Sequence, residues 1–118
     1  MSPETSKAIG DRAERTARDF LIANGLAFVT QNYRCKMGEI DLILREGETW
    51  VFVEVKYRSD TAHGEPVEFF TAVKQRRVLS AVKLFLLDNQ LNEFHTSIRI
   101  DVIAIHGDAL QWFKNVTG

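Results

Sequence analysis

The sequence predicts a mixed α/β fold in which helices pack on the faces of a mixed β-sheet. Two stretches carry apolar residues at helical spacing, and five shorter stretches are rich in β-forming residues. Their order along the chain is helix, three strands, helix and two strands. Because three strands follow one another without a helix between them, we expect antiparallel neighbours and no fully parallel sheet.

The first helix is expected from near Pro3 to about Asn24. Asn24 followed by Gly25 is a common stop signal at the C-terminal end of a helix. The apolar residues of this stretch recur at the spacing of one helical face, and they are Ile9, Ala13, Ala17, Phe20 and Leu21.

Three strands are expected next, over residues 26–34, Ile40–Leu44 and Trp50–Val55. All three are rich in β-branched and aromatic residues, which favour strands. The segment "REGET" joins the last two strands as a turn. If Gly47 and Glu48 are its central residues, glycine supplies the positive φ that a two-residue hairpin turn needs.

The second half of the chain predicts a loop, a helix and two strands. Gly64 and Pro66 interrupt the pattern after the third strand, and a helix is expected from about Glu68 to Asp88. The strand "SIRIDVIAI" follows, and after the turn "HGDA" a last short strand is expected around Leu110–Phe113. The apolar face of this helix consists mainly of Phe70, Val73, Ala81, Val82, Phe85 and Leu86.

The composition is that of an ordinary globular protein, and we expect one domain over residues 1–118. No apolar run approaches the roughly 20 residues of a membrane span, and the N-terminus lacks the apolar core of a signal peptide, so we expect a cytoplasmic protein. The single cysteine, Cys35, excludes an internal disulfide and a Cys-based zinc site. A net charge of −1 argues against nonspecific nucleic-acid binding by bulk charge alone.

The two faces of the predicted hairpin differ in character. One face is aliphatic and is expected in the core: Ile40, Leu42, Leu44, Val51, Val53 and Val55. The other face is apolar at Ile43 and Phe52 but charged at the end where Asp41 and Glu54 lie. This asymmetry predicts a cleft at one end of the sheet.

Four charged residues lie on the charged side of this hairpin: Glu39, Asp41, Glu54 and Lys56. With the turn placed as above, Asp41 faces Glu54 and Glu39 faces Lys56. Opposite side chains have Cβ atoms about 4.5–5.5 Å apart, so the two carboxylates repel each other, and burial increases the repulsion. Lys56 or a divalent cation such as Mg²⁺, which prefers oxygen ligands, can compensate. A solvated face with a Glu39–Lys56 ion pair is the structural alternative, and the residues alone leave both interpretations open.

A further carboxylate comes from the first helix. Gly10, Glu14, Ala17 and Leu21 lie on one helical stripe, so Glu14 borders the face that is expected to be buried. An acid in that position is costly unless it is paired or liganded. The structural alternative is an exposed Glu14 paired with Arg18, worth roughly a few tenths of a kcal/mol, and the sequence alone slightly favours this alternative.

Several motifs together resemble the YraN-like family of uncharacterised bacterial proteins. They are a "GxxxE" pattern ending at Glu14, "GEIDLI", "VFVEVKYR", "HGEP" and "RIDVIAI". The resemblance spans roughly Ala8 to Ile105. That family is similar to the PD-(D/E)XK nuclease superfamily, which includes restriction endonucleases and archaeal Holliday-junction resolvases, so the resemblance implies a restriction endonuclease-like core.

The resemblance also implies metal-dependent hydrolysis of nucleic-acid phosphodiester bonds. The superfamily motif matches Asp41 and the sequence Glu54-Val55-Lys56, although Ile40 stands where the motif's name has proline. Mg²⁺ or Mn²⁺ is then expected on Asp41, Glu54 and the backbone carbonyl of Val55. Glu14 matches the helix glutamate of the resolvase-like branch, as a further ligand or catalytic group. Lys56 is expected to position or deprotonate the attacking water.

Phosphate contacts are expected from Arg58, Lys74 and Arg77, whereas Arg76 is more simply a solvated residue. The expected partner is nucleic acid, preferably DNA, and branched or structured DNA in particular. The resemblance to resolvase-like proteins also implies a homodimer. Two alternatives stay open. One is a nucleic-acid-binding protein of the same fold that does not cut, and the other is a structural protein whose acids are ion-paired.

Overall fold

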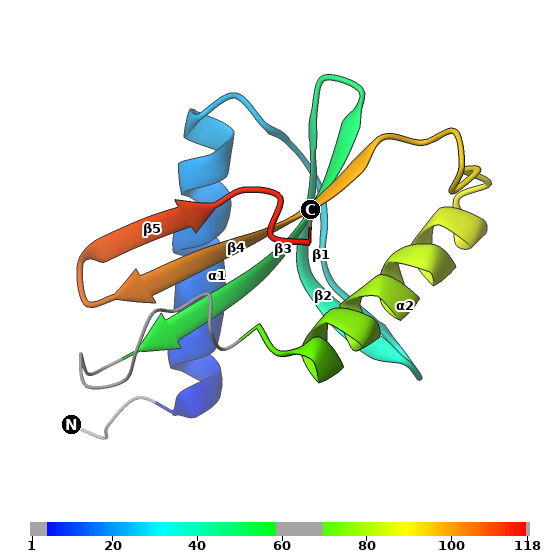
Figure 1. The fold of residues 1–118 in the computed structure, drawn as a ribbon. Helices are drawn as coiled ribbons and strands as arrows, with labels where there is room; N and C mark the ends of the chain where they lie inside the picture. Colours follow the sequence, from blue (N-terminus) through cyan, green and yellow to red (C-terminus); the bar gives the residue numbers. More distant parts are fainter. Residues whose placement is uncertain (1–4, 59–69, 118) are drawn as a thin grey trace.

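The computed structural model describes residues 5–58 and 70–117. Its elements follow the predicted order of helix, three strands, helix and two strands (Figure 1). They are α1 (Ser6–Ala23), β1 (Ala27–Cys35), β2 (Gly38–Glu46), β3 (Thr49–Arg58), α2 (Ala72–Asp88), β4 (Ile98–His106) and β5 (Ala109–Phe113).

One mixed sheet carries the strands in the order β1-β2-β3-β4-β5. The first three form an antiparallel meander, α2 connects β3 to the parallel strand β4, and β5 returns antiparallel to β4. The predicted hairpin register is confirmed, since Leu44 pairs with Val51 and Glu46 with Thr49. Gly47 has a φ of 61°, as the turn requires.

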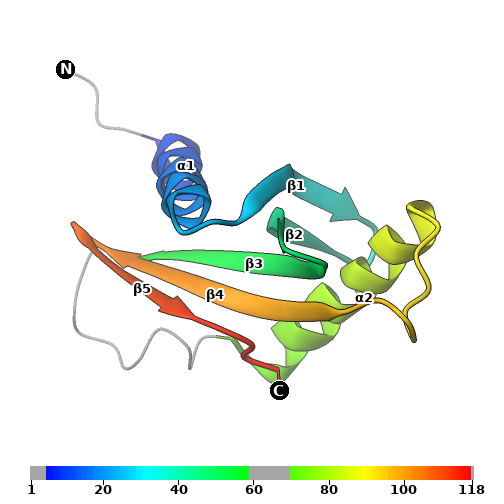
Figure 2. The same cartoon turned by 90° about the horizontal axis from the view of Figure 1, so that it is seen from above.

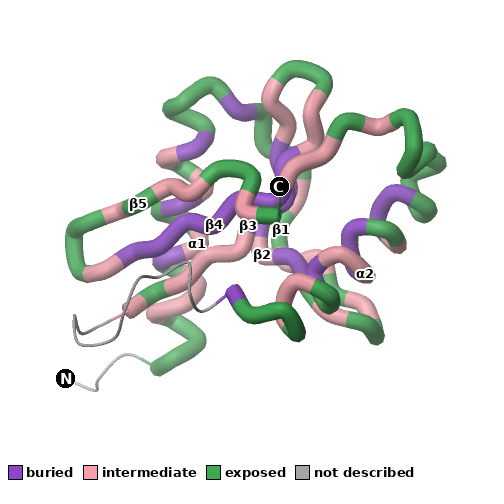
Figure 3. The backbone as a smooth tube through the Cα atoms, viewed as in Figure 1, coloured by how far each residue is buried: buried purple, intermediate pink, exposed green. Residues whose placement is uncertain are grey.

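The two helices cover opposite faces of the sheet (Figure 2). The α1 layer includes Leu42, Leu44, Val51 and Val53, which confirms the aliphatic face of the hairpin. The buried parts of the chain follow the central strands and the inner sides of the helices (Figure 3). Ile40 was predicted on the α1 face, but it packs in the α2 layer. It lies beyond the last pair of β2 and β3, where simple alternation across a flat hairpin no longer holds.

Both helices begin with a threonine cap. The hydroxyl oxygen of Thr5 accepts a hydrogen bond from the backbone of Ala8, and that of Thr71 accepts one from Lys74. The second helix was predicted to start at about Glu68, with Phe70 inside it. This prediction is wrong for Phe70. Thr71 is the N-cap, so Phe70 lies before the helix and packs into the core from outside it. The predicted start near Pro3 and the "HGEP" segment lie outside the described residues.

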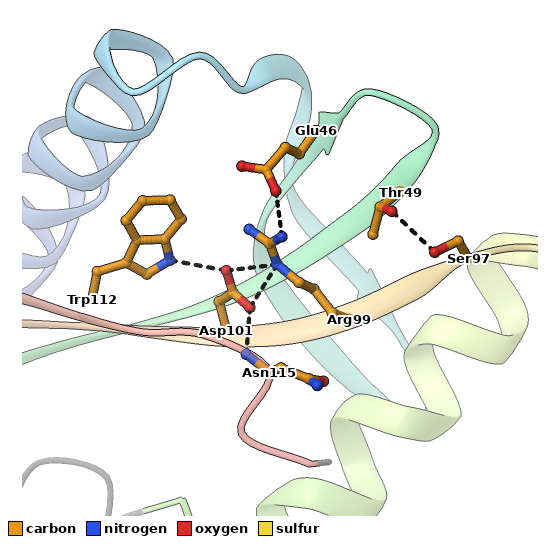
Figure 4. A network of polar contacts seen from close by, with 7 residues as sticks. All are labelled: Glu46, Thr49, Ser97, Arg99, Asp101, Trp112 and Asn115. Atoms are coloured by element: carbon orange, nitrogen blue, oxygen red, sulfur yellow. Dashed lines mark hydrogen bonds and ion pairs between the residues drawn. The ribbon is translucent and has the colours of Figure 1, made fainter.

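A buried polar network joins β4, β5 and the following segment (Figure 4). Asp101 is completely buried and accepts hydrogen bonds from Trp112 Nε1 at 2.9 Å, from the backbone of Asn115 at 2.9 Å and from Arg99 Nε at 3.2 Å. Arg99 also contacts Glu46 at 2.6 Å. Asp101 thus pairs with a basic residue inside the protein. The network fixes the edge of the sheet formed by β4 and β5.

Neither of the helices in the described part of the chain is long and apolar enough to cross a membrane.

Candidate active site

The site begins where β2 and β3 separate. The pairing of the two strands runs from Glu46–Thr49 to Leu42–Val53. Beyond it, the carboxylate of Asp41 accepts a hydrogen bond from the backbone N–H of Val55, at 2.8 Å. The side chain of Asp41 therefore lies against β3 beside Glu54, at the sheet end where a cleft was predicted.

Lys56 pairs with Glu54 rather than with Glu39. Lys56 Nζ lies 3.1 Å from Glu54 Oε1, and the two side chains are 19% and 15% exposed. Glu39 instead contacts Arg34 at 3.3 Å on the surface. The predicted alternative of a Glu39–Lys56 cross-strand pair is thus wrong. Glu54 and Lys56, two positions apart on β3, project from the same face of the sheet and meet there.

Glu14 enters from α1 and is half-buried beside the buried Ala13, Ala17 and Leu21, so it is not the exposed residue that the sequence alone slightly favoured. It does not pair with Arg18, which contacts Asp19. Its carboxylate instead forms a hydrogen bond with the side chain of Asn32 on β1.

The carboxylates repel one another electrostatically. Burial, followed by the negative charge of Glu54, raises the pKa of Asp41 from 3.8 to about 8, and Glu14 and Glu39 contribute in the same direction. Burial also raises the pKa of Glu14, and the charge of Asp11 adds to this effect. Asp41, Glu54 and Glu14 therefore lie close enough together for their charges to influence one another.

Three cations approach the carboxylates from the other side. Lys74, in the first turns of α2, lies close to Lys56, and this contact between like charges lowers the pKa of Lys74, as do its burial and the nearby charge of Arg58. Burial acts to lower the pKa of Lys56, but the contact with Lys74 and the charges of Glu54 and Asp41 outweigh it, so that this pKa is raised. Lys56 therefore keeps its proton, and the predicted residues Lys74 and Arg58 lie beside the candidate site.

A pocket of about 410 Å³ opens next to Glu54. Lys74, Arg77 and Val78 of α2 form one wall, and residues 34–39 around the β1–β2 turn form the other. Arg77, a predicted phosphate contact, therefore lines the pocket beside Glu54. Arg76 is exposed and does not line the pocket.

The donor groups match the preferences of Mg²⁺, which takes oxygen ligands and is commonly held by one or two carboxylates plus waters and phosphate oxygens. Asp41 and Glu54 supply carboxylates. The N–H and C=O of a strand residue point to the same side, so the carbonyl of Val55 faces Asp41 as its N–H does. No group of three Asp, Glu, His or Cys side chains in residues 5–58 and 70–117 is arranged to hold an ion by itself. These donors thus fit a metal site in which water molecules and phosphate oxygens of the substrate supply the remaining ligands.

Two features of the site were not predicted. The first is Asn32, which has a φ of 53° within β1 and contacts Glu14. An asparagine in a strand is a sign of such a conformation, because Asn tolerates positive φ better than most residues. The second is the wall around Lys36 and Gly38, which only the packing of the β1–β2 turn against α2 brings to the site.

Comparisons with known proteins match nearly the whole chain. Residues 13–105 match the uncharacterised protein family UPF0102. The chain is 44% identical over 112 residues to a UPF0102 protein of Vibrio cholerae, an alignment that covers 93% of this chain and 92% of that protein. It is 46% identical over 106 residues to a UPF0102 protein of Aeromonas hydrophila, covering 90% and 82% respectively. A UPF0102 protein of Colwellia psychrerythraea is 41% identical over 110 residues, covering 90% of this chain and 85% of that protein.

Proposed function

The chain belongs to the uncharacterised protein family UPF0102, the YraN-like proteins, and from that premise we propose that it is a metal-dependent nuclease that hydrolyses phosphodiester bonds, with DNA as the preferred substrate. The observation that carries the proposal is the meeting of Asp41 and Glu54 at the separating ends of β2 and β3, with Lys56 in contact with Glu54. The resemblance to PD-(D/E)XK nucleases adds the order of these residues along the chain.

The electrostatics of the site support a cation in this place. Burial and the charge of Glu54 raise the pKa of Asp41 to about 8, so that ionising it beside Glu54 is costly. A divalent ion, Mg²⁺ or Mn²⁺, bound to Asp41, Glu54 and the Val55 carbonyl would offset both charges. When bound, such an ion supplies an acidified water and stabilises charge on the phosphate.

The remaining steps fall to residues of the chain itself. Lys56 is a compact cation held by Glu54, and it is suited to orient the attacking water and to neutralise the developing charge of the phosphate. Lys74, Arg58 and Arg77 hold the neighbouring phosphates and so fix the strand against the site. Glu14 completes the acidic side of the site, and Asn32 orients it.

A second candidate is a nucleic-acid-binding protein of the same fold that does not cut. The observation that favours it is that no three potential ligand side chains within the described ranges are arranged to hold an ion. A binding protein needs only the cations Arg58, Lys74 and Arg77. Catalysis better explains why Asp41, Glu54 and Glu14 are all present. A protein that only binds nucleic acid has no use for carboxylates clustered where a phosphate would lie.

The test is cleavage of a labelled panel of single strand, duplex, flap and four-way junction in the presence of Mn²⁺. Wild-type protein is compared with Asp41→Asn and Glu54→Gln. The matched control is Glu48→Gln, which removes the same charge from the exposed hairpin turn. We expect metal-dependent cutting by the wild type and the control, and a loss of at least about a hundredfold in both site variants.

Calorimetry with Mn²⁺ distinguishes the other outcomes. An ion bound by the wild type and lost in Asp41→Asn, without cutting of any substrate, would mean a site that lacks its substrate. Binding of nucleic acid without cutting and without an ion at the site would favour the second candidate. Equal cutting by all four proteins would refute the assignment of Asp41 and Glu54.

A further inference from the structure

The pocket beside Glu54 has two walls that are fixed to each other. Gly38 lies so close to α2 that a Cβ added to it would come within 2.7 Å of the Arg77 carbonyl oxygen and 3.1 Å of the Arg77 Cβ. The backbone of the β1–β2 turn therefore rests directly on the helix. Because this contact is backbone against backbone, the fold itself holds together the two walls that border the space of about 410 Å³.

The lining is cationic at its edges and has a small apolar part. Arg34, Lys36, Lys74 and Arg77 face two carboxylates, Glu39 and Glu54. Arg34 is paired with Glu39, and Glu54 with Lys56. The side chains of Lys36 and Arg77 form no ion pair or hydrogen bond with any other residue of the described ranges, so their charges are available to a ligand. The apolar part consists of Cys35, Met37 and Val78.

A pocket of this shape is not needed to hold a continuous duplex. A duplex presents its sugar–phosphate ridge to a protein and keeps its bases stacked inside, so an open cationic surface is enough to bind it. A recess takes a nucleotide that has left the stack, as in enzymes that draw a base into a pocket. Unstacked bases also pack on the planes of arginine side chains, and Arg34 and Arg77 are on opposite walls.

We infer that this pocket binds one unpaired nucleotide of the substrate strand, next to the phosphodiester that is cut. The base lies against Met37 and Val78 between the two arginine-bearing walls, and Lys36 and Arg77 contact its phosphate. The inference rests on the proposed function, and it narrows the substrates to strands with an unpaired nucleotide at the cut, such as single strands, flaps and branch points.

Binding measured without cleavage tests the pocket apart from the chemistry. Fluorescence anisotropy with a labelled oligothymidylate and with a blunt duplex of equal length, in EDTA, gives the preference of the protein for the unpaired strand. We expect Lys36→Ala and Arg77→Ala each to lower this preference about tenfold, the size of one lost charge-assisted contact. The matched controls Lys83→Ala and Arg76→Ala remove the same charges from exposed positions that do not line the pocket, and they should change it less than twofold.

The same four variants are then compared in cleavage of a flap and of its continuous duplex. The inference is supported if Lys36→Ala and Arg77→Ala reduce cutting of the flap more than cutting of the duplex. It is wrong if the wild type binds the duplex as tightly as the single strand, or if Arg76→Ala and Arg77→Ala have equal effects, since bulk charge would then explain binding. A preference for the single strand that depends on Arg77, in a protein that neither cuts nor binds Mn²⁺ at Asp41, would support the pocket and refute the nuclease. Cutting of the duplex by a protein that shows no preference for the single strand would support the nuclease and refute the pocket.

Discussion

Replacing Asp41 by Asn should stabilise the metal-free protein. The change removes a negative charge that burial and Glu54 oppose, yet the amide oxygen can still accept the hydrogen bond from the backbone of Val55. Glu54→Gln is a poorer test of this repulsion, because it also removes the partner of the half-buried Lys56. Asp41 is therefore the residue at which the cost of gathering the carboxylates is measured most cleanly.

The magnitude follows from the difference between the ordinary pKa of 3.8 and the value of about 8 in the fold. At about 1.4 kcal/mol per pKa unit, the difference sets an upper bound of roughly 6 kcal/mol. Asp41 is only half-buried, and Lys56 partly neutralises Glu54, so we expect about 2–3 kcal/mol. This corresponds to an increase of about 10 °C in the melting temperature of a chain of this length.

The effect should depend on pH in a defined direction. Below pH 3.8 the carboxyl of Asp41 is protonated in both the folded and the unfolded chain, so the variant gains nothing from the loss of charge. Between pH 3.8 and about 8 the folded protein binds the proton more tightly than the unfolded chain does, and the wild type loses stability as the pH rises. The advantage of Asp41→Asn should grow over this window and level off above it.

Urea unfolding in EDTA at pH 5 and pH 9 measures the difference, with Glu48→Gln as the control for loss of one exposed charge. The reasoning fails if Asp41→Asn is no more stable than the wild type at pH 9, or if its advantage is the same at both pH values. Adding Mn²⁺ should stabilise the wild type and leave Asp41→Asn nearly unchanged, because the proposed ion needs the carboxylate.

Three further predictions concern other parts of the molecule. Gly38→Ala should lower the free energy of unfolding by about 1–3 kcal/mol, because its Cβ meets the Arg77 carbonyl; an unchanged urea midpoint would contradict the close contact. Asp101→Asn should cost about 3 kcal/mol by depriving the half-buried Arg99 of a charged partner, and a loss below about 1 kcal/mol in the same assay would refute this. Contacts of the four cations Arg58, Lys74, Arg77 and Lys36 with phosphates should give a slope near −3 for log K against log salt on single strands, and a flat dependence in anisotropy titrations would exclude nucleic-acid binding.

The elements and part of the site could be read from local sequence. The helical spacing of Ala13, Ala17 and Leu21 predicts both the first helix and its buried face. The turn at Gly47 determines the hairpin register, because a two-residue loop leaves the strands no freedom to slide. From that register it follows that Asp41 and Glu54 come close together, since only local geometry is involved.

Which charges meet was decided by the tertiary structure. The paired part of β2 and β3 ends at Leu42 and Val53. Beyond this pair Glu54 contacts Lys56, and Ile40 lies on the other face of the sheet from the one that alternation predicts. The approach of Lys74 to the site depends on how α2 crosses the sheet. Contacts of this kind depend on the twist of the sheet and on helix packing, which bring together residues far apart in the chain. Local periodicity specifies which face of an element is buried, and it carries no information on which other element covers that face.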